Sequence, residues 1–211
     1  MNQEPILNEE TTEVTAPPKK VSGVTSSLFD ILEMFAWSVV VVMLLFTFAL
    51  RLCRVEGSSM ENTLYNGENL LLYSIAYTPQ QDDIIVFHLT NEDADMEKTM
   101  VKRVIATEEQ KVVIDFENKV ITVDGEEYAD SHAVLKNLSN RIIDEYTLTP
   151  EHSYDPKTRT FSATVPKGHI FAMGDNRNNS KDSRDTDVGF IDERCILGKV
   201  ILRFAPFTVF S

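Results

Sequence analysis

The sequence has little cysteine, and its histidines are scattered. Its 211 residues include 2 cysteines, Cys53 and Cys195, and 4 histidines, and no C-x-x-C pair or His/Cys cluster occurs. Two cysteines are too few for a disulfide scaffold, and the pattern offers no zinc site, so packing must stabilise the fold. We expect Cys53 and Cys195 to be isolated buried thiols rather than a disulfide.

The sequence is also poor in basic residues. It has 20 Lys and Arg against 33 Asp and Glu, a net charge of -13 at pH 7 and a pI near 4.7. No cluster of Lys and Arg offsets this balance, which excludes nucleic acid as a partner. With 43% hydrophobic and 25% charged residues, the composition is that of a globular protein with a real core, which excludes disorder over most of the chain.

A long hydrophobic run occurs at residues 28–50 (LFDILEMFAWSVVVVMLLFTFAL), although the mean hydropathy of the whole chain is -0.16. About 20 residues at about 1.5 Å each span a hydrocarbon core of about 30 Å. A secretory signal peptide would have a shorter apolar core and a small-residue cleavage site soon after it, whereas Arg51 to Arg54 follow here. A buried core helix would be shorter and amphipathic. The run therefore predicts a single transmembrane helix.

The segments that flank this run do not fix its orientation. Residues 1–27 combine Glu, Thr and Pro with scattered apolar residues, which is typical of a disordered acidic tail. Lys19 and Lys20 on one side are matched by Arg51 and Arg54 on the other, so the positive-inside count is a tie.

Beyond residue 51 the pattern changes to short apolar runs, rich in β-branched residues and bounded by Gly, Asp and Asn. Residues 117–127 (ENKVITVDGEE) predict a hairpin, and no long amphipathic helix pattern intervenes. Residues 90–98 and 130–159 are polar and are expected to be irregular insertions. The fold class is therefore mainly β, with predicted strands at residues 69–73, 83–89, 100–106, 111–116, 119–123, 169–173 and 195–204.

Two segments place chemically useful residues on this β framework. In residues 55–64 (VEGSSMENTL), Gly57 permits an unusual backbone conformation beside Ser58 and Ser59, but alone the segment is typical of a turn. In the strand at residues 99–106 (TMVKRVIA), alternation places Lys102 on an apolar face. Such a lysine either reaches solvent or is buried, and a buried lysine loses its proton readily and can act as a general base.

A third segment, residues 174–184 (GDNRNNSKDSR), is dense in hydrogen-bonding side chains. In order, the hydrophobic span, G-x-S-M-x-x-T-L, D-I-x-V-F, K-R-V-I-A and M-G-D-N-R-x-N-S-x-D-S-R resemble type I signal peptidases. These are membrane-anchored serine proteases that remove signal peptides from exported proteins. The resemblance covers about residues 28–204 and includes VPKGHIFAMGDNR and VGFIDERCILGKV.

The resemblance implies roles for individual residues. Ser59 matches the nucleophile and Lys102 the general base of a Ser-Lys dyad, and Ser180 matches the residue that orients the lysine amine. Because a serine hydroxyl is a poor nucleophile, such a lysine needs a pKa about 2 to 3 below its ordinary value of about 10.4. Arg103 and Asp175 match a supporting ion pair. Asp182 and Arg184 match a second pair near the site.

The oxyanion hole of this family would use the Ser59 backbone N–H and a second donor. Some members have a serine hydroxyl where this sequence has Gly57, so a backbone N–H near Gly57 or the Ser58 hydroxyl is the candidate. Two further departures are Asn62, where the family usually has Pro, and Asp82, where it usually has Gly. We expect both to change loop geometry rather than chemistry.

The expected organisation is a cytoplasmic tail (1–27), the membrane helix (28–50) and an extracytoplasmic catalytic domain (51–211) that resembles a β-sheet or β-barrel, with a smaller β region inserted at about 107–168. Ser59 lies nine residues after Leu50, so even an extended chain reaches only about 30 Å, which keeps the nucleophile near the membrane. There it would meet signal peptides of preproteins that emerge from the export machinery, beside membrane lipid. No metal or other cofactor is implied.

Two other functions fit parts of this pattern. A soluble Ser-Lys autoprotease that cleaves repressors would carry a DNA-binding domain, against which the acidic charge and the hydrophobic span argue. A non-catalytic membrane-anchored β domain that binds an envelope partner remains the alternative. It would tolerate the loss of Ser59 and Lys102.

Overall fold

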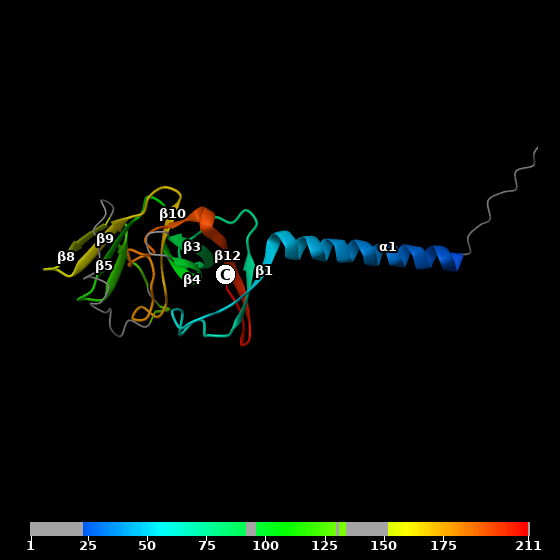
Figure 1. Ribbon diagram of the computed structural model, residues 1–211, viewed down its shortest axis with the longest axis horizontal. Helices are drawn as coiled ribbons and strands as arrows, with labels where there is room; N and C mark the ends of the chain where they lie inside the picture. The colour runs from blue at the N-terminus through cyan, green and yellow to red at the C-terminus, as the bar shows by residue number, and fades with distance from the viewer. Residues whose placement is uncertain (1–22, 92–95, 130, 134–151, 211) are drawn as a thin grey trace, which may run out of the picture. The chain divides into compact units, whose positions relative to one another are not determined.

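The computed structural model describes residues 23–91, 96–129, 131–133 and 152–210, which form parts of two compact units, 1–43 and 44–211. Most of the tail predicted at residues 1–27 lies outside these residues. Figure 1 shows helix α1 of the first unit and the strands of the second.

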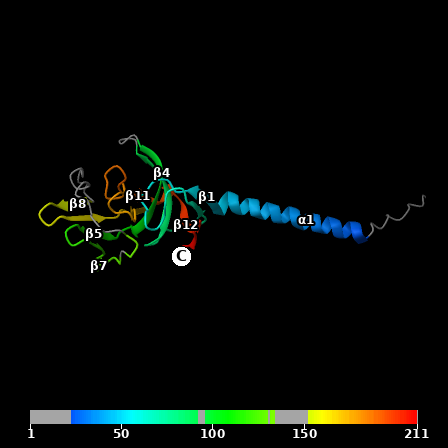
Figure 2. The ribbon, with the colours of Figure 1, turned by 90° about the horizontal axis from the view of Figure 1, so that it is seen from below.

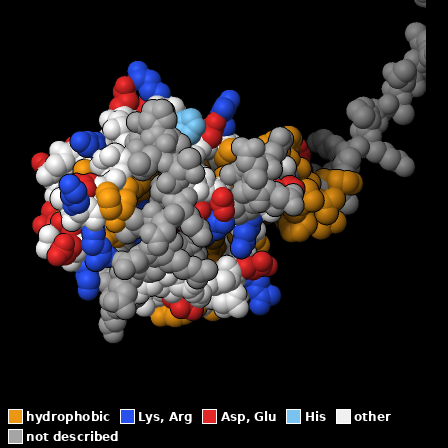
Figure 3. Space-filling model, turned by 60° about the vertical axis from the view of Figure 1, so that its left-hand side comes forward, with side chains coloured by type: hydrophobic (Ala, Val, Ile, Leu, Met, Phe, Trp, Pro, Cys, Tyr) orange, Lys and Arg blue, Asp and Glu red, His pale blue; other side chains and the backbone are white. Residues whose placement is uncertain are grey.

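The described part of the first unit lies in helix α1 (Gly23–Leu44), which begins before the predicted start at Leu28. The segment Ser27–Ala49 is long and apolar enough to cross a membrane. The large apolar side chains of this helix are exposed, among them Met34 and Trp37, and in Figure 3 the helix at the right of the view is almost entirely hydrophobic. A helix that is apolar on all sides suits a lipid environment, so it is consistent with membrane anchoring.

The second unit begins with a short π-helix, η1 (Leu45–Ala49), and continues into two antiparallel sheets. The first sheet has eight strands in the order β1-β2-β12-β3-β4-β10-β11, with β13 paired to β12. Their bounds are β1 (Leu50–Arg54), β2 (Asn69–Tyr73), β3 (Ile84–Asn91), β4 (Met96–Ala106), β10 (His169–Met173), β11 (Ile191–Asp192), β12 (Ile196–Phe204) and β13 (Phe207–Val209), and a 3-10 turn, η3 (Glu193–Cys195), precedes β12. The mainly β prediction is confirmed.

The second sheet has five strands in the order β7-β6-β5-β9-β8. They are β5 (Lys111–Asp115), β6 (Val120–Val123), β7 (Glu126–Glu127), β8 (His152–Asp155) and β9 (Thr160–Thr164). All five lie within the range 107–168 expected for an inserted region. In Figures 1 and 2 this sheet lies at the end of the unit that is away from β1.

Two segments predicted to be irregular contain strands instead. In the predicted insertion 90–98, residues 90–91 and 96–98 belong to β3 and β4, which pair from Ile84↔Arg103 to Asn91↔Met96, and residues 92–95 lie outside the described part. The outer residues Glu97, Lys98 and Thr99 are exposed, so backbone pairing holds them and no apolar alternation marks them in the sequence. Likewise β8 lies inside the segment 130–159, at the edge of its sheet, where it pairs only with β9. Residues 134–151 of that segment lie outside the described part.

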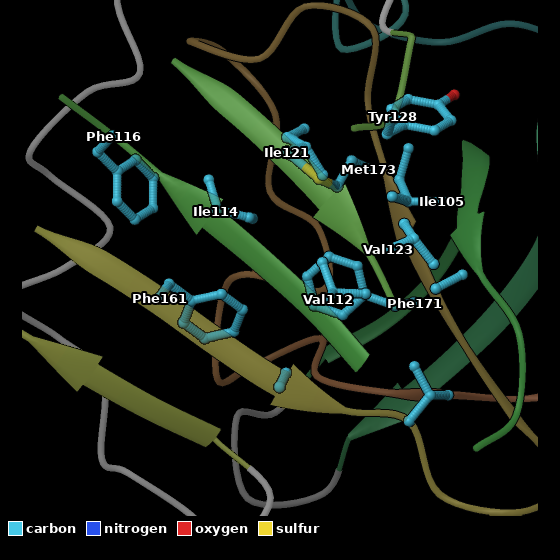
Figure 4. Packing of buried hydrophobic residues seen from close by; sticks show 13 residues of the cluster. Ile105, Val112, Ile114, Phe116, Ile121, Val123, Tyr128, Phe161, Phe171 and Met173 are labelled. Carbon is cyan, nitrogen blue, oxygen red and sulfur yellow. The ribbon is translucent and has the colours of Figure 1, made fainter. Parts of the chain in front are cut away.

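The second sheet packs on the first through a cluster of buried apolar side chains (Figure 4). Val112, Ile114 and Phe161 of the second sheet meet Phe171 and Met173 of β10, and all five are almost completely buried. The ring centroids of Phe161 and Phe171 lie 6.0 Å apart. This shared core explains why residues 44–211 form one compact unit.

The first sheet is buried on both of its faces at β3. Ile84 and Val86 belong to one apolar cluster, and Ile85 and Phe87 belong to another. Side chains alternate along a strand, so β3 is covered from both sides and reads in the sequence as a continuous apolar run. The two cysteines are free thiols, as expected, but both are half-buried rather than buried.

Candidate active site

The turn that carries Ser59 connects β1 to β2 and is anchored by its own apolar residues. Met60 and Leu64 are buried in the core, and the N–H of Leu64 donates to the carbonyl of Met60 at 2.8 Å. Gly57 has a φ of +89°, a left-handed conformation that favours glycine. The turn therefore holds the two serines between a buried anchor and a glycine bend.

Lys102 and Ser59 meet across 43 residues of sequence. Lys102 Nζ lies 2.8 Å from Ser59 Oγ and 3.0 Å from the Val101 carbonyl oxygen, to which it donates. Lys102 is only 3% exposed. It lies on β4, and the neighbouring residues on the same face of this strand are apolar. The strand alternation predicted this apolar face, and the lysine is buried on it instead of reaching solvent.

Burial lowers the pKa of Lys102 to about 8. The nearby carboxylate of Asp182 opposes this shift, whereas the positive charges of Lys98 and Arg184 add to it. Desolvation disfavours the ammonium form because the charge cannot be hydrated. A substantial fraction of this lysine is therefore a neutral amine near pH 8, in the range that a general base requires.

Both ion pairs that the sequence predicted are formed in the structure. Arg103 binds Asp175 with two hydrogen bonds, Nε to Oδ1 at 2.9 Å and Nη2 to Oδ2 at 2.8 Å. Arg184 binds Asp182 in the same manner, with Nε to Oδ1 at 2.8 Å and Nη2 to Oδ2 at 2.9 Å. All four residues are buried, so each charge is compensated by a fixed partner, as buried charges must be.

These pairs also hold the turn of the serine. Thr63 donates from its hydroxyl to Asp175, so the carboxylate that binds Arg103 of β4 is also tied to the serine turn. Asp182 accepts a hydrogen bond from the N–H of Gly174 at 3.0 Å. A Cβ added at Gly174 would lie 2.3 Å from Ser180 Oγ and 2.4 Å from the Ser59 carbonyl oxygen. Only glycine allows the loop to approach the serine this closely.

Ser180 lies beside the dyad but makes no hydrogen bond to Lys102. Its Oγ is buried and has no hydrogen-bond partner among the described residues. It lies near Asp182. Burial raises the pKa of the Asp182 carboxyl, but Arg184, with smaller effects of Gly174 and Ser180, lowers it by more, so the net pKa lies below its ordinary value. That Ser180 orients the lysine amine stays a prediction.

Several asparagines that the sequence analysis did not single out bind the serine turn. Asn176 donates from its N–H to the Ser59 carbonyl at 3.0 Å and from its side chain to the Ser58 carbonyl at 3.0 Å. Asn179 donates to Ser58 Oγ at 2.8 Å, and Asn66 accepts from the N–H of Gly57 at 3.0 Å. The density of Asn in residues 174–184 was the available signal for Asn176 and Asn179, but not for Asn66. The sequence alone does not identify the hydrogen-bond partners of these asparagines.

The dyad opens into a cleft of about 870 Å³. Its walls come from residues 52–60, from residues 98–102 of β4, and from the loop at 178–186. Strand β10 pairs with β4 from Ala106 to Arg103. Along residues 98–102, no described strand pairs with the edge of β4 that faces away from β3. The cleft thus has a strand edge that no described strand covers, next to a nucleophile and a base.

The sequence comparisons decide the family. Residues 28–205 match the family described as signal peptidase, peptidase S26. The chain belongs to this family. Signal peptidase IB of Staphylococcus aureus (strain Mu50) is 35% identical over 160 residues, which cover 74% of this chain and 78% of that protein. A probable signal peptidase I-1 of Synechocystis sp. is 34% identical over 159 residues, covering 72% of this chain and 69% of that one.

A solved structure of the same family was also found. The crystal structure of a signal peptidase I from Enterococcus faecalis V583 matches 58% of this chain and 97% of its own, with 24% identity and a TM-score of 0.38.

Two departures from the usual peptidase S26 pattern lie at positive φ, which explains the absence of Pro at the first but not the absence of Gly at the second. Asn62, at the position where the family usually has Pro, has a φ of +87°. Proline is fixed near -65°, so it could not adopt this conformation. Asp82, where Gly is usual, also has a positive φ of +73°, and its carboxylate accepts a hydrogen bond from the hydroxyl of Tyr128. Both residues shape loops and neither touches the dyad.

Proposed function

We propose that this protein is a membrane-anchored serine endopeptidase that cleaves N-terminal signal peptides from exported preproteins with a Ser59–Lys102 dyad. The observation that carries the proposal is the distance of 2.8 Å between Lys102 Nζ and Ser59 Oγ, in a chain of the peptidase S26 family. The lowered pKa of Lys102, about 8, supports its assignment as the base.

The reaction is an acyl transfer in two steps. Ser59 Oγ attacks the scissile carbonyl carbon while neutral Lys102 takes the hydroxyl proton. Collapse of the tetrahedral intermediate breaks the C–N bond, and Lys102 returns the proton to the leaving amine, which leaves an ester on Ser59. Lys102 then removes a proton from a water molecule that attacks this ester, and the proton passes to Ser59 as the signal peptide departs.

The cleft supports an extended substrate. A peptide strand can pair with the backbone groups of β4 at residues 98–102, because no described strand pairs with them on that side. Such pairing leads the scissile bond toward Lys102 and Ser59. By family resemblance, small residues at the first and third positions before the cut fill shallow pockets.

The proposed location is a cell membrane, with the tail on the cytoplasmic side and residues 51–211 outside. The support is chain length: Ser59 lies ten residues after Ala49, the end of the apolar segment, so the nucleophile lies within about 35 Å of the end of the span. Signal peptides that leave the export machinery present their cleavage sites at this surface. Long domains translocate largely regardless of flanking charge, so Arg51 and Arg54 do not oppose this orientation.

The test uses the full chain in membranes. Ser59→Ala should stop signal-peptide cleavage and cause uncleaved preproteins to accumulate, with the protein still folded and membrane-bound. Ser162→Ala, which removes a hydroxyl from β9 outside the cleft, is the matched control and should leave cleavage unchanged. Normal processing by Ser59→Ala would overturn the dyad. A serine-directed acylating inhibitor that labels the wild type at Ser59 would separate the enzyme from a non-catalytic binding domain.

A further inference from the structure

We propose that the Ser58 hydroxyl is the second hydrogen-bond donor of the oxyanion hole, and that Asn179 is the residue that positions it. The inference rests on the proposed function, because it concerns the charge that develops when Ser59 attacks a carbonyl group. The backbone N–H of Ser59 makes no hydrogen bond among the described residues and is the first donor. One donor leaves much of the charge of the tetrahedral intermediate unstabilised.

The backbone of Gly57 is already engaged in the folded protein. Its N–H donates to Asn66 Oδ1 at 3.0 Å, inside a turn whose ends are joined by hydrogen bonds of 2.8 Å from Val55 N to Glu68 O and from Gly67 N to Val55 O. To reach an oxyanion, this N–H would have to leave its partner and distort the turn. Gly57 therefore shapes the turn and does not supply the second donor.

Ser58 is placed to do so. It is half-buried and lines the same cleft as Ser59 and Lys102. Its backbone cannot swing away, because the side chain of Asn176 holds the Ser58 carbonyl and the N–H of Asn176 holds the carbonyl of Ser59, both at 3.0 Å. With the backbone fixed, the side-chain torsions of Ser58, χ1 and the rotation of the hydroxyl, decide where the hydrogen points.

Asn179 controls this rotation. A hydroxyl has one hydrogen to donate and two lone pairs that accept. Asn179 donates from Nδ2 to Ser58 Oγ at 2.8 Å, so it occupies one lone pair and turns the hydrogen away from itself. No acceptor among the described residues takes that hydrogen. Asn179 is itself held in the loop by a hydrogen bond of 2.9 Å from its N–H to the Asn176 carbonyl. The result is a preoriented donor beside the nucleophile.

The experiment measures kcat and KM for a signal-peptide substrate with the purified full chain in detergent micelles. Ser58→Ala should lower kcat about 10²-fold with little change in KM, because an oxyanion donor acts in the transition state. Ser58→Thr keeps the hydroxyl and should retain most of the activity. Asn179→Ala should lower kcat about two- to tenfold, which is the effect of one lost orienting hydrogen bond. Asn179→Asp, whose carboxylate accepts the Ser58 hydrogen, should lower kcat at least as much as Ser58→Ala.

A double-mutant cycle separates positioning from structure. In the Ser58→Ala background, Asn179→Ala should have no further effect on kcat. The pH profile of kcat should keep its apparent pKa near that of the wild type in every variant, since Lys102 is intact. The inference is overturned if Ser58→Ala keeps kcat within threefold of the wild type, or if Asn179→Ala costs the same with and without Ser58. Failure of the dyad is a different result: Ser59→Ala would then still cleave.

Discussion

The two sheets of residues 44–211 bury different kinds of side chain. The second sheet packs on β10 through apolar and aromatic groups, whereas the loops and strands around Ser59 bury the charged residues Lys102, Arg103, Asp175, Asp182 and Arg184. Apolar packing contributes stability directly, but every buried charge must first lose its hydration. The apolar core of the second sheet thus stabilises the fold. The burial of charged groups around Ser59 lowers the stability and keeps Lys102 at a lowered pKa.

The largest expected effect separates catalysis from stability at Lys102. Lys102→Met keeps the size of the side chain and removes the base, so it should lower kcat about 10²- to 10⁴-fold. Because the folded-state pKa of about 8 is below the ordinary 10.5, the unfolded chain binds more protons between pH 8 and 10.5. In wild type the stability contribution of this lysine is therefore poorest below pH 8 and improves as pH rises through that window.

Lys102→Met should abolish this pH dependence and raise the free energy of unfolding at pH 7 by up to about 3 kcal/mol. Urea unfolding at pH 7 and pH 10, alongside a cleavage assay, measures both effects. A variant that is inactive and also less stable at pH 7 would contradict the idea that the buried charge costs stability. In the wild type, kcat/KM should rise with pH through about 8, as the amine loses its proton.

An intermediate effect is expected from the core of the second sheet. Phe161→Ala removes a buried ring that contacts Phe171 and should lower the free energy of unfolding by about 3 to 5 kcal/mol. The kcat of the protein that remains folded should stay within about twofold of the wild type, since no residue of the dyad touches this ring. Thermal unfolding and the cleavage assay at a low temperature are the measurements. A large loss of kcat in fully folded protein would show that the two sheets are not separable in this way.

The smallest effect is expected at the link between the two regions. Tyr128 is buried with the second sheet, and its hydroxyl donates to Asp82 beside β3; burial, together with this carboxylate, raises the pKa of the Tyr128 hydroxyl. Tyr128→Phe should lower the free energy of unfolding by about 1 kcal/mol and leave kcat unchanged. Tyr154→Phe, a matched loss of a hydroxyl on the edge strand β8, should cost less. If Tyr128→Phe lowered kcat, the carbonyl of Asp82, which accepts from Arg103, would be the route to examine.

Much of the fold could be predicted because burial leaves a pattern in the sequence. Strands β2 and β10 coincide with their predicted ranges, since each alternates or runs apolar against a core. The outer ends of β3 and β4 and the edge strand β8 could not be predicted, because backbone pairing alone defines them and solvent places no demand on their side chains.

The residues of the candidate site also divide into those that could be predicted from the sequence and those that could not. Ser59 and Lys102 could be proposed from the motifs, and alternation placed Lys102 on the apolar face of β4. Alternation left open whether the lysine reaches solvent or is buried, and the structure shows that it is buried. The positive φ values of Asn62 and Asp82, and the binding of Ser58 by Asn179, depend on how distant segments meet. A single sequence holds no periodic signal for such contacts.

Gly174 has a consequence for which sequences this site can tolerate. Any side chain at this position would push against Ser180 Oγ and the Ser59 carbonyl oxygen at less than 2.5 Å, and the latter is backbone that cannot give way cheaply. Glycine is thus the one amino acid that fits at this position, next to the backbone of the nucleophile Ser59. Any single substitution of Gly174 is therefore expected to displace the serine turn and to lower activity, even though Gly174 is buried and does not line the cleft.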